Sequence, residues 1–339
     1  MKRYDGLNND EITHAFELHK NSIVINCSAV IKQDDEHFNR SHIGGITAHN
    51  HTVTRPNDNL SESIKSISNF LYWAHANEQK CLIVKLAKDI IKAKNTGKIA
   101  FILGPQNAKF LEDISLIHCF KALGVRILQL TYQYKNQIGD GCGERTDNGL
   151  SEFGINLIEE MNKIGILIDL SHVGRCTTFE AIEISKDPII FSHSHPYRLN
   201  PHIRNKTDEQ IKAMSEKGGV IGITKYSPIC ELKSGVRPDV EDYMKHIDYV
   251  VELAGIDHVG IGLDFNEPST PEIWASFASA YPELSGGYTF SEKGVKDLDQ
   301  LSKVPNITKG LVGRGYSDQE IKKILGLNFL KVFKKVWGS

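Results

Sequence analysis

Eight short apolar runs, separated by stretches with helical patterning, most constrain what this 339-residue chain can fold into. Runs such as GILIDL, PIIFS and GVIGIT are apolar on both faces. Strands need this pattern when helices cover one face of the sheet and a packed interior lies against the other. The runs comprise residues 22–30, 45–52, 99–104, 126–132, 165–172, 188–194, 219–224 and 258–265.

The segments between the runs carry helix start and stop signals. Thr207 and Gln210 have the spacing of a capping box, and two glycines that can end the helix follow at 218–219. Ser317 and Glu320 repeat the capping pattern before IKKILGLNFLKVFKKVW. Strands that alternate with helices predict an α/β fold, and the count of eight favours a (β/α)8 TIM-type barrel over a doubly wound open sheet. We expect residues 1–339 to form a single barrel domain with an N-terminal helix and a C-terminal helical extension.

Charge and cysteine content exclude several classes of protein. Forty Lys and Arg residues nearly balance 42 Asp and Glu residues, which argues against nucleic acid or an anionic membrane as the main partner. The six cysteines are scattered without CxxC spacing, as expected of reduced thiols. The sequence shows neither a secretory signal nor an apolar stretch of membrane-spanning length. We therefore expect a cytoplasmic protein.

Polar side chains recur at the carboxyl ends of the predicted strands, where barrel enzymes place their chemistry. Histidines on adjacent strands can converge on one metal ion, and a carboxylate two strands later can take a proton from the water that the ion activates. His172, His193 and Asp264 fit this pattern best. The full set of strand-end residues is Asn26, Cys27, His49, His51, Gln106, Asn107, Tyr132, His172, His193, His195, Lys225, Tyr226 and Asp264.

Other features allow both a functional and a structural interpretation. His49 and His51 form an HxH pair that would share one face of a strand. His195 and His202 lie in the loop after their strand, where we expect exposure to solvent. The glycine-rich residues 139–144 suit a flexible loop near the substrate. The aromatic segment 266–294 suits a cover over the barrel mouth or an oligomer contact.

Four strings together resemble the membrane dipeptidase family (renal dipeptidase-like, peptidase family M19), which belongs to the metal-dependent, amidohydrolase-type barrels. They are LIDLSHVG, PIIFSHS, HIRNKTDEQIKAMSEKGGVIGIT and HIDYVVELAGIDHVGIGLDF. The resemblance runs from about residue 20 to the C-terminus and is most specific between residues 150 and 265. It implies hydrolysis of dipeptides, including those with a C-terminal D-residue, by a barrel that holds two zinc ions.

Position by position, the resemblance implies that His172 and His193 bind metal, Asp264 is the catalytic acid or base, and Arg204 binds the substrate carboxylate. The first half of the chain differs from the family pattern. Asn26-Cys27-Ser28 replaces the His-x-Asp pair, Gln106 replaces the bridging glutamate, and Tyr132 replaces a histidine. A neutral amide bridges two cations poorly, so we expect about one zinc ion per chain, or none. Should two ions bind, His49, His51 or Glu144 would have to supply the missing ligands.

The leading hypothesis is a metal-dependent hydrolase of the amide bond in a small dipeptide-like substrate. Gln106 and Tyr132 would bind the scissile carbonyl or the water, and Asn107 and Tyr226 would contact substrate beside Arg204. The alternatives are a hydrolase of another small amide or N-substituted amino acid, with a mononuclear or metal-free site, and a non-catalytic barrel that binds a small ligand. Relatives of this family are often dimers, so a homodimer is a further expectation.

Overall fold

The computed structural model describes residues 2–267 and 269–338. Its strands are β1 (Ile25–Val30), β2 (Ala48–His51), β3 (Cys81–Ile83), β4 (Ile99–Leu103), β5 (Ile127–Gln129), β6 (Leu167–Asp169), β7 (Ile190–Ser194), β8 (Val220–Ile223), β9 (Val259–Ile261) and β10 (Phe265–Asn266). The strands of both sheets are parallel, in the orders β10-β1-β2-β4-β3 and β5-β6-β7-β8-β9.

The two sheets join at both ends to form a barrel. Leu103 at the end of β4 bridges to Val125 just before β5. On the other side, β10 continues the direction of β9 after a short break and pairs with β1, with Ala29 opposite Phe265. Each of the eight predicted runs contains a strand of this ring, so the predicted (β/α)8 barrel is confirmed. Strand β3 was not predicted, and it pairs with the first half of β4.

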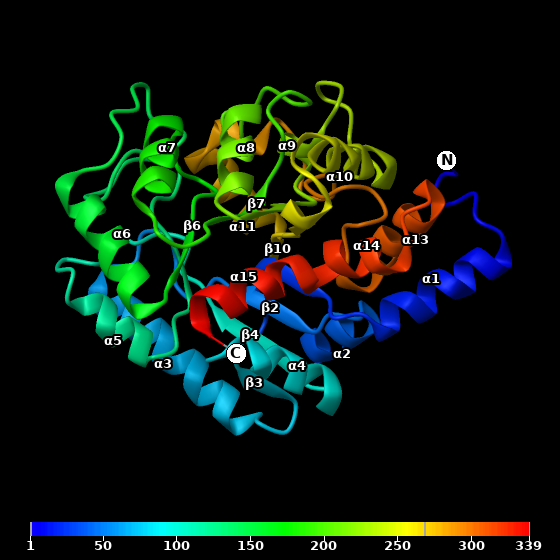
Figure 1. Ribbon diagram of the computed structural model, residues 1–339, viewed down its shortest axis with the longest axis horizontal. Coiled ribbons are helices and arrows are strands. Elements are labelled where there is room, and N and C mark those ends of the chain that lie inside the picture. Colours follow the sequence, from blue (N-terminus) through cyan, green and yellow to red (C-terminus); the bar gives the residue numbers. More distant parts are fainter. Residues whose placement is uncertain (1, 268, 339) are drawn as a thin grey trace.

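The helices surround the strands (Figure 1). They are α1 (Asn9–Asn21), α2 (Asp35–Ile43), α3 (Leu60–Ala76), α4 (Ala87–Thr96), α5 (Leu116–Ala122), α6 (Glu152–Ile164), α7 (Arg175–Ile184), α8 (Asp208–Glu216), α9 (Ser227–Cys230), α10 (Val240–Ala254), α11 (Pro271–Ala280), α12 (Pro282–Ser285), α13 (Pro305–Arg314), α14 (Asp318–Lys322) and α15 (Asn328–Trp337). Helix α8 begins with the predicted capping box, in which Thr207 and Gln210 bond reciprocally. Within the described residues, no helix is long and apolar enough to span a membrane.

Successive strand residues point alternately into and out of the barrel, as the period of two requires. The inward set, such as Ala100, Ile102 and Ile190, forms one buried cluster with Phe329 and Phe333 of α15. Helix α15 lies across the strands on the side that faces the viewer in Figure 1. It therefore fills one end of the barrel and leaves the opposite end, where the strands finish, for the site.

The predicted long C-terminal helix is interrupted between α14 and α15. Gly326 departs from helical geometry inside a π-helical turn over residues 323–327. A Cβ atom at this position would lie 2.4 Å from the carbonyl oxygen of Ile23, which leads into β1. The chain passes too close to the barrel here for any residue with a side chain, and the helix axis changes at this contact.

Candidate active site

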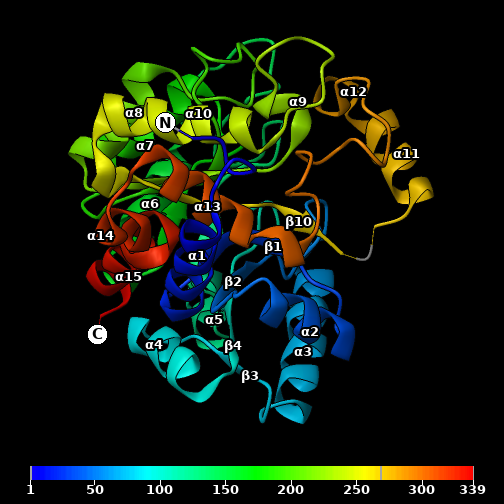
Figure 2. The same ribbon diagram turned by 90° about the vertical axis from the view of Figure 1, so that its right-hand side faces the viewer.

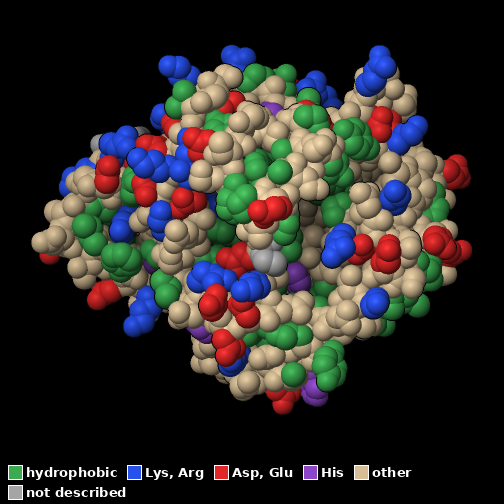
Figure 3. Space-filling model, turned by 180° about the vertical axis from the view of Figure 1, so that it is seen from behind, with side chains coloured by type: hydrophobic (Ala, Val, Ile, Leu, Met, Phe, Trp, Pro, Cys, Tyr) green, Lys and Arg blue, Asp and Glu red, His purple; other side chains and the backbone are tan. Residues whose placement is uncertain are grey.

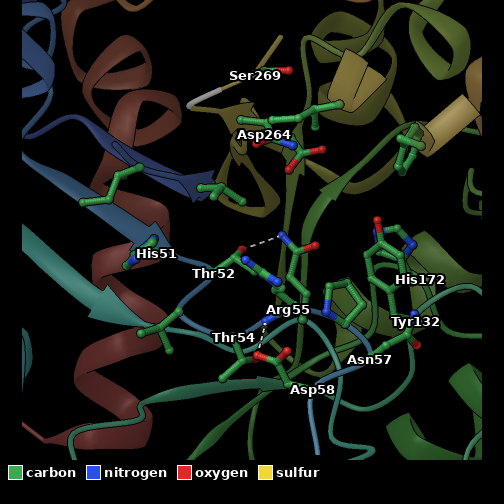
Figure 4. A pocket seen from close by; sticks show the side chains of 18 of the residues that line it. His51, Thr52, Thr54, Arg55, Asn57, Asp58, Tyr132, His172, Asp264 and Ser269 are labelled. Atoms are coloured by element: carbon green, nitrogen blue, oxygen red, sulfur yellow. Dashed lines mark hydrogen bonds between the residues drawn. The ribbon is translucent and has the colours of Figure 1, made fainter. Parts of the chain in front are cut away.

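The carboxyl ends of the strands open into a cavity of about 1010 Å³. The molecule is visibly hollowed on this face (Figure 3). Figure 4 shows Tyr132 and His172 together on one wall, with Asp264 approaching from another direction. Six of the eight predicted site residues line this cavity: Gln106, Tyr132, His172, Arg204, Tyr226 and Asp264.

Two imidazoles meet beyond β6 and on β7. The Nε2 atom of His172 lies 3.1 Å from the Nε2 atom of His193. The Nδ1 atom of His193 lies 2.7 Å from the hydroxyl of Ser192, which donates to Asp169 at 2.5 Å. Since that hydroxyl has one hydrogen and gives it to the carboxylate, Nδ1 of His193 is the donor and its Nε2 carries a lone pair. An outer hydrogen bond that fixes the tautomer in this way is typical of metal-binding histidines.

Burial keeps both imidazoles neutral. It lowers the pKa of His172 well below the ordinary value, and the neighbouring charge of Arg204 lowers it further. Burial likewise lowers the pKa of His193, although Asp264 opposes this effect. Neutral imidazole is the form that binds a metal ion.

Asp264 is held at the end of the eighth strand in an uncommon backbone conformation, with φ of 53°. Its backbone N–H donates to the carbonyl of Ser28, and the hydroxyl of Ser28 donates to its Oδ1 atom at 2.9 Å. Burial alone would raise the pKa of Asp264. The electrostatic interaction with the His193 ring, the Ser28 hydrogen bond, and the charges of Lys225 and Arg204 outweigh this effect, so that the pKa is lowered. Asp264 is therefore an ionised carboxylate at neutral pH, and strained residues of this kind are common in active sites.

Uncharged side chains occupy the part of the site that the first half of the chain supplies. The Nε2 atom of Gln106 donates to Ser28 Oγ at 3.0 Å and to Thr52 Oγ1 at 2.8 Å, the latter drawn as the dashed line at Thr52 in Figure 4. Asn26 accepts a hydrogen bond from the backbone of Leu263 through its Oδ1 atom. Gln106 and Ser28, two of the positions that differ from the family pattern, thus form with Thr52 an uncharged hydrogen-bonded chain that ends on Asp264.

The donors present fit one divalent cation better than two. Two nitrogens bound to one zinc ion at ordinary distances lie about 3.3 Å apart, close to the separation of the His172 and His193 Nε2 atoms. A second ion would need a bridging carboxylate, and the corresponding position holds the amide of Gln106, which donates hydrogen bonds.

Tyr132 and Arg204 complete the wall around the histidines. The Tyr132 ring stacks on His172, with 4.1 Å between the ring centroids. The guanidinium of Arg204 donates to the carbonyl oxygens of Ser171 and His193. These two bonds fix its plane and leave other N–H groups available toward the cavity, because a guanidinium has five.

Not every predicted residue lies in the cavity. His193 and Asn107 are absent from its described lining. His193 lies behind His172, which it contacts through its Nε2 atom, and the amide of Asn107 donates to the carbonyl of Pro56 and accepts from Asn136, and so ties loops together. Of the HxH pair, His51 lines the cavity, whereas His49 is buried between Asn26 and Ser41.

The expectation that His195 is exposed is wrong. The side chain is completely buried, and its Nε2 atom bonds to the carbonyl of Thr224. The chain turns back after β7, and Lys206 donates its backbone N–H to the carbonyl of His195, which places this part of the loop inside the fold. Glu144 lines a separate, smaller cavity of about 210 Å³.

Sequence reasoning missed several residues that shape the site. Ser28 and Thr52 connect Gln106 to Asp264, and Lys293 adds a positive charge to the cavity wall. Asp169 and Ser192 orient His193. The only available signal was position, since Asp169 ends β6 and Ser192 directly precedes His193.

The aromatic segment at 266–294, described apart from residue 268, contributes to the mouth of the cavity. Trp274, Phe277 and Tyr281 line it from α11 and the residue just beyond. Helices α11 and α12 project to one side of the barrel above β10 (Figure 2). This agrees with the predicted cover over the barrel mouth.

Comparison with known proteins gives the family. The model of the membrane dipeptidases, peptidase family M19, matches residues 10–287 and 283–337. An uncharacterized dipeptidase of Schizosaccharomyces pombe is 32% identical over 259 residues, which are 74% of this chain and 57% of that protein. The dipeptidase verJ of Clonostachys rogersoniana is 30% identical over 257 residues, 75% of this chain and 60% of that protein. The chain therefore spans little more than half the length of these curated relatives.

Solved structures share the fold over nearly the whole chain. An amidohydrolase from Pseudomonas aeruginosa is 35% identical with a TM-score of 0.89, covering 96% of this chain and 99% of that one. A metallopeptidase from Rhodobacter sphaeroides, liganded with a phosphinate mimic of the dipeptide L-Ala-D-Ala, has a TM-score of 0.78 at 17% identity, covering 94% of this chain and 100% of that one. With the sequence match and the barrel in agreement, the chain belongs to the membrane dipeptidase family, peptidase family M19.

Proposed function

We propose that this protein is a metal-dependent hydrolase that cleaves the amide bond of a dipeptide or dipeptide-like substrate. The observation that carries the proposal is a pair of neutral imidazoles, His172 at the wall of a large cavity and His193 with its Nε2 atom 3.1 Å from that of His172, together with the ionised carboxylate of Asp264 at the same wall. General base, metal ligands and substrate space then lie at one end of the barrel, where such enzymes act.

His172 and His193 would hold one divalent cation, and zinc is the ion best matched to nitrogen ligands of this kind. When bound, such an ion polarises a carbonyl and makes a water molecule more acidic. Asp264 accepts the proton of the attacking water, since its lowered pKa keeps it ionised near pH 7. Ser28 holds that carboxylate in place through the hydroxyl bond to its Oδ1 atom.

The remaining polar groups would orient the substrate. Arg204 and Lys225 place positive charge at the cavity, suited to a substrate carboxylate, and Arg204 offers the planar fork that binds carboxylates in a bidentate manner. Burial raises the pKa of Tyr132, and Asp264 raises it further, so its hydroxyl remains a hydrogen-bond donor to the scissile carbonyl. The Tyr226 hydroxyl already donates to the carbonyl of Leu284, so this residue contributes its ring to the cavity.

Dipeptides are the substrate class that the comparisons support. The curated relatives are described as dipeptidases, and the Rhodobacter sphaeroides structure holds a mimic of L-Ala-D-Ala. The cavity of about 1010 Å³ is at the upper end of ordinary ligand pockets, so a bulky side chain is accommodated beside α11.

The test is a panel of dipeptides with L- and D-residues at the C-terminal side, assayed with wild type and His172→Ala. We expect turnover of at least one member by wild type and loss of turnover, together with loss of metal, in the variant. His42→Ala is the matched control, since His42 is exposed on α2. Full activity in His172→Ala would refute the role given to this residue.

A second candidate follows from the uncharged hydrogen-bonded chain of Gln106, Ser28 and Thr52. A site with one cation instead of two suits another small amide or an N-substituted amino acid. The same assay separates the candidates when cyclic and N-methylated amides are added: turnover of these alone, without any dipeptide, favours the second.

A further inference from the structure

A second group of metal-binding side chains lies outside the cavity just described. One ring nitrogen of His195, one of His246 and the Sγ atom of Cys230 all lie within 4.8 Å of one another. His195 follows β7, Cys230 ends α9 and His246 belongs to α10. All three side chains are completely buried, and none lines the main cavity.

The tautomers of the two histidines can be read from their partners. The Nε2 atom of His195 lies 2.9 Å from the carbonyl oxygen of Thr224. The Nε2 atom of His246 lies 2.8 Å from the carbonyl oxygen of Cys230. A carbonyl only accepts, so each Nε2 atom carries the hydrogen and each Nδ1 atom carries a lone pair.

Neither Nδ1 lone pair has a hydrogen-bond partner within the described residues. Leaving a buried polar atom unsatisfied costs about 1–3 kcal/mol, so two of them in contacting rings are unusual. The ring centroids are 4.1 Å apart. Backbone carbonyls that accept from the outer ring nitrogen are the usual partners of metal-binding histidines.

Two further buried oxygens beside this group are also unsatisfied: Oδ1 of Asn205 and Oγ of Ser227. The amide of Asn205 donates to the carbonyl of Ile229, the residue before Cys230, and Ser227 lies one helical turn before Cys230. These four unpaired atoms therefore lie on α9, on α10 and in the loop after β7, the segments that carry the three side chains of the group. Around one zinc ion, nitrogen and sulfur ligands lie about 3.3–3.6 Å apart, and one candidate ligand atom from each of the three residues already lies within 4.8 Å of the other two.

We propose that His195, Cys230 and His246 bind a structural divalent metal ion, with zinc as the best match to two imidazoles and one thiolate. Binding displaces the thiol proton of Cys230 to solvent and leaves both histidines neutral.

The position of the site gives it a consequence for the cavity. The loop that begins at His195 carries Arg204, and α9 begins directly after Tyr226. A metal ion that joins these elements to α10 would fix two residues of the cavity wall without touching substrate. Loss of the ion is therefore expected to raise KM more than it lowers kcat.

Cobalt(II) provides the test, because a thiolate bound to cobalt gives a charge-transfer band in the near ultraviolet. The full chain is stripped with a chelator, dialysed and titrated with cobalt chloride. We expect the band in wild type and in His172→Ala, and its loss in Cys230→Ser. Cys81→Ser is the matched control, since Cys81 is a buried cysteine whose Sγ bonds to backbone carbonyls.

The absence of the band in cobalt-saturated wild type, or its persistence in Cys230→Ser, would overturn the proposal. If Cys230→Ser fails to fold, X-ray absorption of zinc-loaded wild type decides instead. One sulfur at about 2.3 Å from zinc is the expected result, and a spectrum with only nitrogen and oxygen neighbours contradicts it.

Discussion

The carboxylate of Asp169 controls which nitrogen of His193 carries the proton, although it touches neither the cavity nor the ring. Its Oδ2 atom accepts the hydroxyl hydrogen of Ser192, while its Oδ1 atom accepts from the backbone and side chain of Ser171 and the backbone of Ser192. In Asp169→Asn, the amide nitrogen takes the place of Oδ2 and donates to Ser192. The Ser192 hydroxyl is then free to point its hydrogen at Nδ1 of His193, the nearer of its two remaining neighbours, which moves the ring proton to Nε2.

The magnitude follows from the number of bonds affected. Outer partners of metal-binding histidines contribute tenfold to hundredfold to metal affinity, which is about 1.4–2.7 kcal/mol. A hydrogen bond to a charged acceptor stabilises the folded state by about 1 kcal/mol more than a neutral one. The four bonds that Asp169 accepts therefore set an upper limit of about 4 kcal/mol on the loss of folding stability in Asp169→Asn. Part of this loss is offset because a neutral amide is less costly to bury than a carboxylate.

Long-range nitrogen–proton NMR of histidine-labelled protein distinguishes the two neutral tautomers directly, and His193→Gln assigns the signal. We expect His193 to change from the Nδ1–H form in wild type to the Nε2–H form in Asp169→Asn, with weaker zinc binding by calorimetry. Asp147→Asn is the control, because Asp147 also accepts several hydrogen bonds but does so around the start of α7. An unchanged tautomer with weakened metal binding would refute the reasoning.

Three further predictions concern stability, each measured by urea unfolding. Burial lowers the pKa of His19 to about 4, so below about pH 6.5 the unfolded chain binds a proton at this residue that the folded chain does not. About 3 kcal/mol of folding stability is therefore lost between pH 6.5 and 4, and His19→Gln removes that part of the pH dependence. Phe333→Ala empties part of the barrel interior and costs about 3–5 kcal/mol, whereas Phe16→Ala, at a ring that is 46% exposed, costs little. Gly262→Ala would place a Cβ atom 1.8 Å from a carbonyl oxygen of β7 and costs at least about 3 kcal/mol, against a negligible change for Gly6→Ala, where the nearest atom is 3.6 Å away. Equal effects in either matched pair, or a pH profile unchanged in His19→Gln, would contradict the corresponding argument.

The sequence was sufficient to predict the barrel and the candidate site residues that lie in the second half of the chain. Buried parallel strands appear in the sequence as continuous apolar runs. Because barrel enzymes carry their catalytic residues at the carboxyl ends of the strands, His172, His193 and Asp264 are predicted to lie at the same end of the barrel. Strand β3, Cys81–Ile83, was not predicted, and it pairs only with β4 at the edge of its sheet, outside the ring of eight strands that the barrel pattern predicts.

The burial and direction of side chains that depend on how the loops pack could not be predicted from the sequence. Asn107 follows a strand end as Gln106 does, yet one side chain turns into the cavity and the other into the loops. His195 lies in a loop and is nevertheless buried, because the chain folds back along Lys206. Local spacing determines on which element a residue lies, whereas the direction of a side chain beyond the strand end depends on partners distant in sequence.

The closure of the barrel by α15 also bears on how the protein is made. Ile25 and Ala48 are synthesised long before Phe329 and Phe333, yet the four residues share one buried cluster. The barrel interior therefore stays open to water on the ribosome until α15 has emerged, and contacts of such long sequence separation form slowly. A product of interrupted translation that lacks α15 would expose this apolar interior to chaperones and proteases.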